Sequence, residues 1–123
     1  MKLSRLELEV LQLISEQSET TAPDIHDLIS QKRDTAYSTI KTIFDRLEDK
    51  NAIFRKSKVG RTSIYAARVS PESVQKSLVQ EFVDSIFPED RIPLFNTLIR
   101  DSELSEEEIQ YLKKLLKDQK VKS

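Results

Sequence analysis

The sequence contains no cysteine and no tryptophan, and it has one glycine and one histidine among its 123 residues. Without cysteine, a disulfide framework, a thiolate metal site and a cysteine nucleophile are all excluded. One glycine cannot build a glycine-rich phosphate-binding loop, and no apolar run approaches the roughly 20 residues that span a bilayer. The first residues carry acids where a signal peptide has an unbroken apolar stretch. The sequence therefore predicts a cytoplasmic protein that does not associate with membranes.

Charge is distributed unevenly along the chain, although the formal net charge is only −1. Residues 1–69 hold 12 Lys and Arg against 10 Asp and Glu, whereas residues 70–123 hold 8 against 11. Residues 51–68 hold five Lys and Arg and no acid. A local positive patch on a nearly neutral protein favours contact with a nucleic acid. The alternative is a hairpin whose charges serve only solubility.

Apolar spacing predicts three amphipathic helices, over about residues 5–17, 21–32 and 36–50. A capping box of Ser4 and Glu7 opens the first helix, and Thr21 opens the second. The third helix has a stripe of apolar residues that is expected to be buried, namely Tyr37, Ile40, Ile43, Phe44 and Leu47. Asn51 follows this helix and tolerates the left-handed conformation in which many helices end.

Two short strands are predicted after the third helix, over residues 52–59 and 62–69. Gly60 lies in the turn between them, where it can supply a positive φ. Three helices followed by a hairpin is the element order of a winged helix-turn-helix. The predicted fold class is therefore mainly α with a small β-hairpin, and residues 1–69 form its DNA-binding head.

Residues 70–123 are predicted to form three further helices, which begin at Ser70-Pro71, after Pro93, and at a capping box of Ser105 and Glu108. Their apolar positions include Leu78, Phe82, Ile86, Leu94, Phe95, Leu98, Ile109, Leu112 and Leu116. A tail of about 50 residues is too small to bury these side chains alone. We expect it to form a dimerisation region with a second copy. The alternative is a monomer whose tail folds back on its own head.

The third helix also carries a polar stripe, which comprises Thr35, Ser38, Thr39, Thr42 and Arg46. These positions share one face because their spacing matches the helical repeat. Such a helix fits the major groove of DNA, where hydroxyls can bond base edges and threonine methyls can touch thymine methyls. Tyr37 and Lys41 are added to the predicted DNA contacts, and Lys41 suits a phosphate. An ordinary solvated face is the alternative.

The predicted hairpin supplies a second set of DNA contacts. Arg61, beside Gly60, suits a narrow minor groove, and Lys56 and Lys58, together with Arg55, suit the phosphates. Each neutralised phosphate steepens the salt dependence of binding by about 0.9 on a log-log plot.

With these residues in place, the chain resembles the BlaI/MecI/CopY family of penicillinase and copper-responsive repressors over almost its whole length. Residues 3–14 (LSRLELEVLQLI) are similar to the family's opening helix, and residues 37–51 (YSTIKTIFDRLEDKN) resemble its recognition helix. Gly60-Arg61 with Ile64-Tyr65 resembles its wing, and residues 104–112 (LSEEEIQYL) resemble its last helix. The resemblance implies a winged-helix head, a three-helix dimerisation tail and repression from palindromic operators. It places the family's base and phosphate contacts on Ser38, Thr39, Thr42 and Arg46.

Three departures from the family pattern bear on function. Asn51 stands where the family usually has the glycine that ends the recognition helix. Copper-responsive members carry C-terminal cysteines, and this chain has none, so we expect no metal or other cofactor. Antibiotic-responsive members are cleaved at an Asn-Phe bond by a sensor protease. The matching position here is Asn96-Thr97, which lacks the bulky apolar residue and so argues against this candidate partner.

The preferred hypothesis is a homodimeric repressor that binds a double-stranded DNA operator. A second hypothesis is a winged-helix module that docks a protein and does not read DNA, and it requires an exposed apolar strip on the third helix or the hairpin. A third adds a small-molecule pocket between head and tail. Catalysis is not expected, because His26 lacks a serine or metal-ligand pattern and the acids at 106–108 lie in a first helical turn, where they favour the helix dipole.

Overall fold

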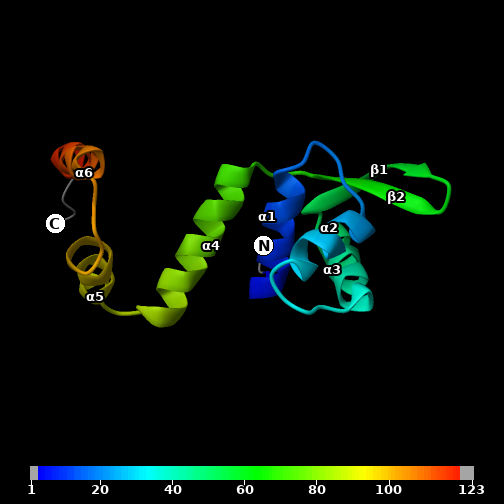
Figure 1. Cartoon of the computed structure of the whole chain (residues 1–123), viewed down its shortest axis with the longest axis horizontal. Coiled ribbons are helices and arrows are strands. Elements are labelled where there is room, and N and C mark those ends of the chain that lie inside the picture. The colour runs from blue at the N-terminus through cyan, green and yellow to red at the C-terminus, as the bar shows by residue number, and fades with distance from the viewer. Residues whose placement is uncertain (1–2, 120–123) are drawn as a thin grey trace. The chain divides into compact units, whose positions relative to one another are not determined.

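The computed structural model describes residues 3–119 and has the predicted order of elements. Its first part comprises α1 (Arg5–Ser15), α2 (Ala22–Ser30), α3 (Tyr37–Asp49), β1 (Ile53–Val59) and β2 (Thr62–Ala67). Its second part comprises α4 (Pro71–Ile86), α5 (Ile92–Phe95), the π-helical turn η1 (Asn96–Arg100) and α6 (Glu106–Asp118). Figure 1 shows α1, α2 and α3 grouped together, with the hairpin extending from them. This arrangement confirms the predicted winged helix-turn-helix.

One hydrophobic core holds the head together. Its largest fully buried side chains come from all three helices of the head, from β1 and from α4: Val10, Ile14, Ile25, Ile29, Ile40, Phe44, Leu47, Ile53 and Val74. The rings of Phe44 and Tyr65 meet edge to face with their centroids 5.0 Å apart, which joins α3 to β2. Tyr37 is an exception to the predicted buried stripe, because 41% of its surface is exposed at the start of α3.

Two residues with a positive φ set the path from α3 through the hairpin. Asn51 ends α3 with a φ of 60°, and Gly60 has a φ of 61° in the turn, as predicted for both. Gly60 and Arg61 are the two central residues of the turn, and only the first of them has a positive φ. A type II′ hairpin turn requires this combination, with glycine at its first central position. The pairing of Arg55 with Tyr65 and of Ser57 with Ile64 leaves Lys56 as the extra residue of a β-bulge, which the sequence did not predict.

The contacts divide the chain into two units, Met1–Phe82 and Val83–Ser123, whereas the sequence placed the boundary after residue 69. The difference arises because the first half of α4 packs on the head. Val74 is 2% exposed in the head's core, and Leu78 is half-buried against it. Leu78, which was assigned to the dimer surface, therefore packs against its own chain.

The second unit departs from the predicted pattern around Pro93. Helix α5 begins two residues earlier than predicted, at Ile92, whose N–H donates to the carboxylate of Asp90 at 3.0 Å. It then widens into η1 instead of continuing as an ordinary α-helix. Helix α6 begins as predicted, because Ser105 and Glu108 exchange the two hydrogen bonds of a capping box. None of the helices within residues 3–119 has the length and hydrophobicity needed to cross a bilayer.

Candidate nucleic-acid interface

The polar stripe of α3 lies open on the surface of the head. Ser38, Thr39, Thr42 and Arg46 are all exposed, while Ile40, Phe44 and Leu47 on the opposite face are fully buried. The Thr42 hydroxyl donates to the carbonyl of Ser38 at 3.0 Å. This hydrogen bond uses the hydroxyl proton of Thr42 within the helix. For contact with a ligand, Thr42 therefore has an oxygen that can accept a hydrogen bond and a methyl group that can make apolar contact.

Thr35 does not belong to this stripe, and its prediction on the helix face was wrong. It lies in the connection before α3, whose N-cap is Ala36 and which has no side-chain cap hydrogen bond. The carbonyl of Thr35 instead accepts a hydrogen bond from Nε2 of His26 at 2.6 Å. The same connection is held to α1 by an ion pair between Arg33 and Glu9.

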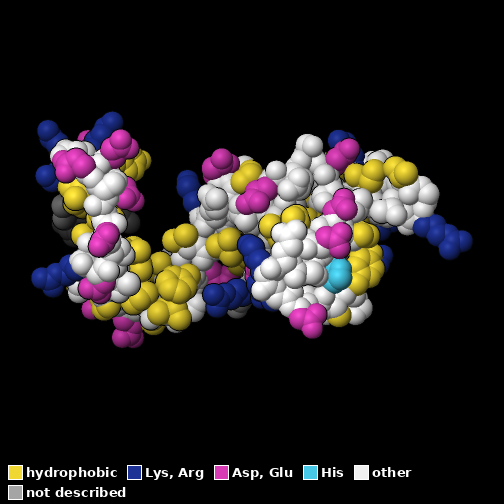
Figure 2. All heavy atoms as spheres, viewed as in Figure 1, with side chains coloured by type: hydrophobic (Ala, Val, Ile, Leu, Met, Phe, Trp, Pro, Cys, Tyr) yellow, Lys and Arg dark blue, Asp and Glu magenta, His cyan; other side chains and the backbone are white. Residues whose placement is uncertain are grey.

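Four cations of α3 and the hairpin face solvent without a charged partner. Lys41 and Arg46 on α3 and Lys58 and Arg61 at the hairpin's end are all exposed, and within residues 3–119 none of the four forms an ion pair. Figure 2 shows a basic side chain extending beyond the tip of the hairpin. These cations can meet phosphates without first breaking an internal salt bridge.

Arg55 and Lys56 at the base of the hairpin differ, because each has a partner. The Arg55 guanidinium lies 3.6 Å from the carboxylate of Glu48 on α3 and donates to the hydroxyl of Tyr65 at 3.3 Å. The hydrogen bond to Tyr65 and then the charge of Glu48 raise the pKa of Arg55. Lys56, the bulged residue, lies 3.2 Å from the carboxylate of Glu19. These contacts tie the hairpin's base to the rest of the head.

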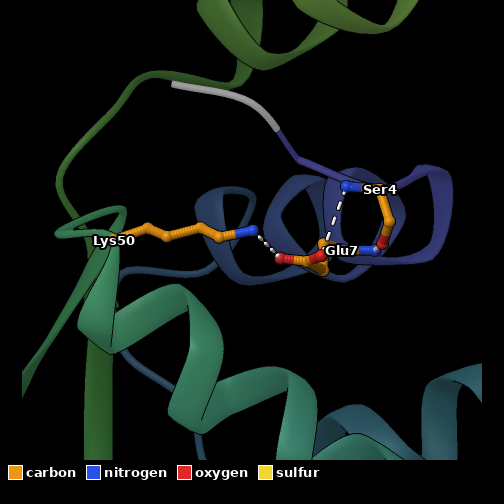
Figure 3. Close-up of polar contacts among 3 residues, drawn as sticks. All are labelled: Ser4, Glu7 and Lys50. Carbon is orange, nitrogen blue, oxygen red and sulfur yellow. Dashed lines mark hydrogen bonds and ion pairs between the residues drawn. The ribbon is translucent and has the colours of Figure 1, made fainter.

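A partly buried ion pair connects the end of α3 to the start of α1 (Figure 3). Nζ of Lys50 lies 2.8 Å from Oε2 of Glu7, whose side chain is 5% exposed. Burial by itself raises the pKa of Glu7, but hydrogen bonds from Lys50 and from Ser4 outweigh it, so the pKa lies below the ordinary value of 4.5. The sequence identified Glu7 as a capping residue and missed this second role. The signal that could have revealed this role is the position of Glu7, an acid within the apolar face of the first helix.

The surface of α3 and the hairpin is not that of an apolar docking site. Among the described residues of these elements, the large hydrophobic side chains that are exposed are Tyr37 and Val59, which lie on different elements. The exposed strip that a protein-docking module requires is therefore missing here. Hydroxyls and unpaired cations occupy this surface instead.

Exposed hydrophobic side chains are concentrated in the C-terminal part of the chain, as Figure 2 shows in yellow. Within residues 3–119, ten of the twelve large hydrophobic residues that are exposed lie between residues 79 and 116. They include the predicted Phe82, Ile86, Phe95, Leu98 and Leu116, and they add Val79, Ile92, Ile99, Tyr111 and Leu115. The predicted Leu94, Ile109 and Leu112 are half-buried.

Asn96 and Thr97, the residues that the sequence matched to a cleavage site, begin η1 with exposed side chains. The Asn96 carbonyl accepts from the N–H of Asp101 at 3.2 Å, and the Thr97 hydroxyl donates to the carbonyl of Pro93 at 3.1 Å. The bond between them lies in a hydrogen-bonded helical turn. Across the described part of the chain, no cluster of three or more metal-binding side chains occurs.

Comparison with known proteins identifies one family over nearly the whole chain. A family model described as Penicillinase repressor matches residues 3–118. An uncharacterized 16.5 kDa protein from the ptsI 3' region of Latilactobacillus sakei is 28% identical over 115 residues, which cover 94% of this chain and 78% of that protein.

Solved structures share the fold of the chain. The DNA-binding domain of the repressor BlaI matches with a TM-score of 0.51 and 28% identity, over 56% of this chain and 83% of that domain. A mutant MarR from E. coli in complex with operator DNA matches with a TM-score of 0.55 and 17% identity, over 94% of this chain and 74% of that one. The transcriptional regulator SlyA matches with a TM-score of 0.55 and 20% identity, over 94% and 72%.

Proposed function

The chain belongs to the penicillinase repressor family, and from this we propose that it is a homodimeric repressor that binds a palindromic operator. Its family and fold are those of winged-helix transcriptional repressors that bind DNA. The exposed stripe of Ser38, Thr39, Thr42 and Arg46 on α3 is the observation that carries the proposal for this chain.

In this proposal α3 enters the major groove with its polar edge toward the bases. The short side chains of Ser38 and Thr39 allow the helix backbone to approach the base edges closely. The methyl of Thr42 is suited to a thymine methyl, and its oxygen accepts from an amino group of a base. Arg46, about two turns beyond Thr39, reaches a guanine edge or a phosphate. Lys41 and Tyr37 flank this edge and contact the backbone.

The hairpin then lies along the duplex as a wing. Arg61 enters the minor groove, where a narrow groove concentrates negative potential, and Lys58 contacts a phosphate. Lys56 adds a weaker phosphate contact because it is already paired with Glu19. The ties of Arg55 to Glu48 and Tyr65 support this arrangement, since they hold the wing in a constant orientation to α3.

The helices from the second half of α4 onward form the dimer in this proposal. The exposed side chains of Phe95, Leu98 and Leu116 support it, because exposed apolar side chains are costly in water and a second copy can cover them. Apart from Leu78, which packs on the head, the predicted set is completed by Phe82, Ile86, Leu94, Ile109 and Leu112. A two-fold pair of heads matches two half-sites about one helical turn apart, so the operator is expected to be an inverted repeat.

Cleavage by a sensor protease is the route of release implied by the family resemblance, and two features of Asn96-Thr97 oppose it. Thr97 is not a bulky apolar residue, and the bond lies in a hydrogen-bonded turn instead of the extended form in which proteases bind their substrates. Co-expression with a sensor protease of the family should leave the chain intact. Two fragments divided after residue 96 would reverse this conclusion.

The test of base reading compares two classes of variant. A duplex selected by the wild-type protein from a random-sequence pool is titrated by fluorescence anisotropy, with poly(dI-dC) as the non-specific reference. Thr39→Ala and Thr42→Ala should each weaken binding to the selected duplex by about 1 to 3 kcal/mol and leave the reference nearly unchanged. Equal losses on both duplexes would show that α3 does not read bases, and sedimentation of the free protein tests the dimer separately.

A further inference from the structure

The start of α3 lacks the usual means of fixing a helix end. Its N-cap is Ala36, which has no side chain that can accept from the first N–H groups. The residues just inside this end, Ser38 and Thr39, are those proposed to meet the bases. A small rotation of the helix start would displace both hydroxyls from their partners. Some other contact must therefore hold this end in place.

His26 of α2 supplies that contact. Its Nε2 lies 2.6 Å from the carbonyl oxygen of Thr35, one residue before the N-cap. Because a carbonyl only accepts, this nitrogen must carry the hydrogen and donate it. The imidazole also meets the ring of Tyr37, the first residue of α3, edge to face at 5.7 Å between centroids. One side chain thus contacts the residues on both sides of the N-cap.

The surroundings of His26 allow this role. The ring is partly buried, and Figure 2 shows the histidine side chain, in cyan, reaching the surface of the head. Ser30 Oγ lies 3.4 Å from the same nitrogen, a longer and weaker contact than the one to Thr35. The ion pair of Arg33 with Glu9 holds the middle of the same connection to α1. His26 is therefore the contact nearest to the DNA-facing end of the connection.

We propose that His26 is a positioning residue for DNA recognition: its hydrogen bond to Thr35 and its ring contact with Tyr37 hold the start of α3 in place of the missing side-chain cap. This inference rests on the proposed function, since it assigns His26 an effect on base reading through α3. His26 itself need not touch DNA. Its loss removes no lysine or arginine from the surface that meets phosphates, so non-specific binding should change little.

The test uses two replacements of His26 in the full-length protein. His26→Leu keeps much of the bulk but has no donor, whereas His26→Gln keeps an N–H that can reach the carbonyl of Thr35. His26→Leu should weaken binding to the selected duplex by about 2- to 13-fold for each half-site, the worth of one hydrogen bond per protomer. Binding to poly(dI-dC) should stay within about 2-fold, since cations dominate it. His26→Gln should restore most of the loss, and Ser30→Ala should have no effect.

A merely structural role for His26 predicts a different pattern. In that case His26→Leu lowers the melting temperature and weakens both duplexes alike, and His26→Gln gives no selective rescue. Either that pattern or wild-type affinity of His26→Leu for the selected duplex overturns the proposal.

An NMR measurement without DNA separates this inference from the proposed function. The ring nitrogen shifts should show the hydrogen on Nε2, and His26→Leu should move the amide resonances of Tyr37 and Ser38 while His26→Gln moves them less. If the wild type does not prefer the selected duplex over poly(dI-dC), the proposed function fails. If it does and these resonances do not move, the positioning role of His26 fails alone.

Discussion

The unpaired cations of α3 and the hairpin lead to a quantitative prediction for the salt dependence of DNA binding. Lys41, Arg46, Lys58 and Arg61 have no ion-pair partner within the described residues, so a dimer presents eight of them. If each neutralises one phosphate, the log-log slope of affinity against salt is about −7, since each contact contributes about −0.9. Lys58→Ala removes one contact from each protomer and should flatten this slope by about 1.8 units.

This change in slope has a measurable size. Over a fourfold change of salt, for example from about 50 to about 200 mM, 1.8 units correspond to about a 12-fold change in affinity. Lys58→Ala should therefore weaken binding at low salt by about 12-fold more than at high salt. Anisotropy titrations with poly(dI-dC) and with the selected duplex at several salt concentrations measure both slopes.

Lys56→Ala is the matched comparison, because Lys56 is two residues away on the same strand and is paired with Glu19. Its slope should change by less than half as much as that of Lys58→Ala. The reasoning is refuted if Lys56→Ala flattens the slope as much as Lys58→Ala, or if neither does. In either case, pairing within the free protein would not determine which cations meet phosphates.

Three further predictions concern stability and assembly. Glu7→Gln should lower the free energy of unfolding at neutral pH by about 1 to 3 kcal/mol, because it removes the charge that pairs with Lys50. The folded pKa of Glu7 lies below 4.5, so this stabilisation is present above the unfolded pKa and is lost as pH falls through the folded one. Chemical denaturation should therefore find the variant and the wild type converging in acid. Asn51→Ala should cost about 1 kcal/mol in the same assay, while Asn51→Gly should cost nothing, because the backbone there has a φ of 60°. Leu98→Asp should raise the dimer dissociation constant, measured by sedimentation, at least about tenfold, because it places a charge in an apolar interface. Leu98→Met should leave the constant unchanged. An unchanged constant for Leu98→Asp would show that Leu98 does not lie in the interface.

The head could be predicted from the sequence because its signals are local. The apolar period of α3 gave the buried positions Ile40, Phe44 and Leu47 directly. Asn51 and Gly60 marked the two sites of positive φ because few other residues adopt that conformation without strain. The polar stripe followed from the same helical period, read on the opposite face.

Contacts between distant residues could not be predicted in this way. Lys50 and Glu7 are 43 positions apart, and nothing near either residue indicates the other. The pairing of Lys56 with Glu19 likewise depends on the bulge in β1, which has no distinctive sequence signal. Thr35 was misplaced because helical spacing continues past the residue at which the helix begins, and the N-cap Ala36 has no capping side chain to mark that point.

The helices that follow the hairpin show a third kind of limit. The apolar positions of its helices were visible in the sequence, but the same pattern would serve a packing site on the head or a dimer interface. Leu78 proved to pack on the head, while Phe95 and Leu98 are exposed. The period of a helix shows which face is apolar, but it does not show what covers that face.

The most direct test of the central claim is the ratio of two affinities of the wild-type protein, measured in one buffer by anisotropy. The selected duplex should bind at least about 1,000-fold more tightly than poly(dI-dC), as expected for a protein that reads bases as a dimer. Equal affinities for the two, or no detectable binding at low salt, would contradict the assignment of α3 and the hairpin as a surface that recognises DNA.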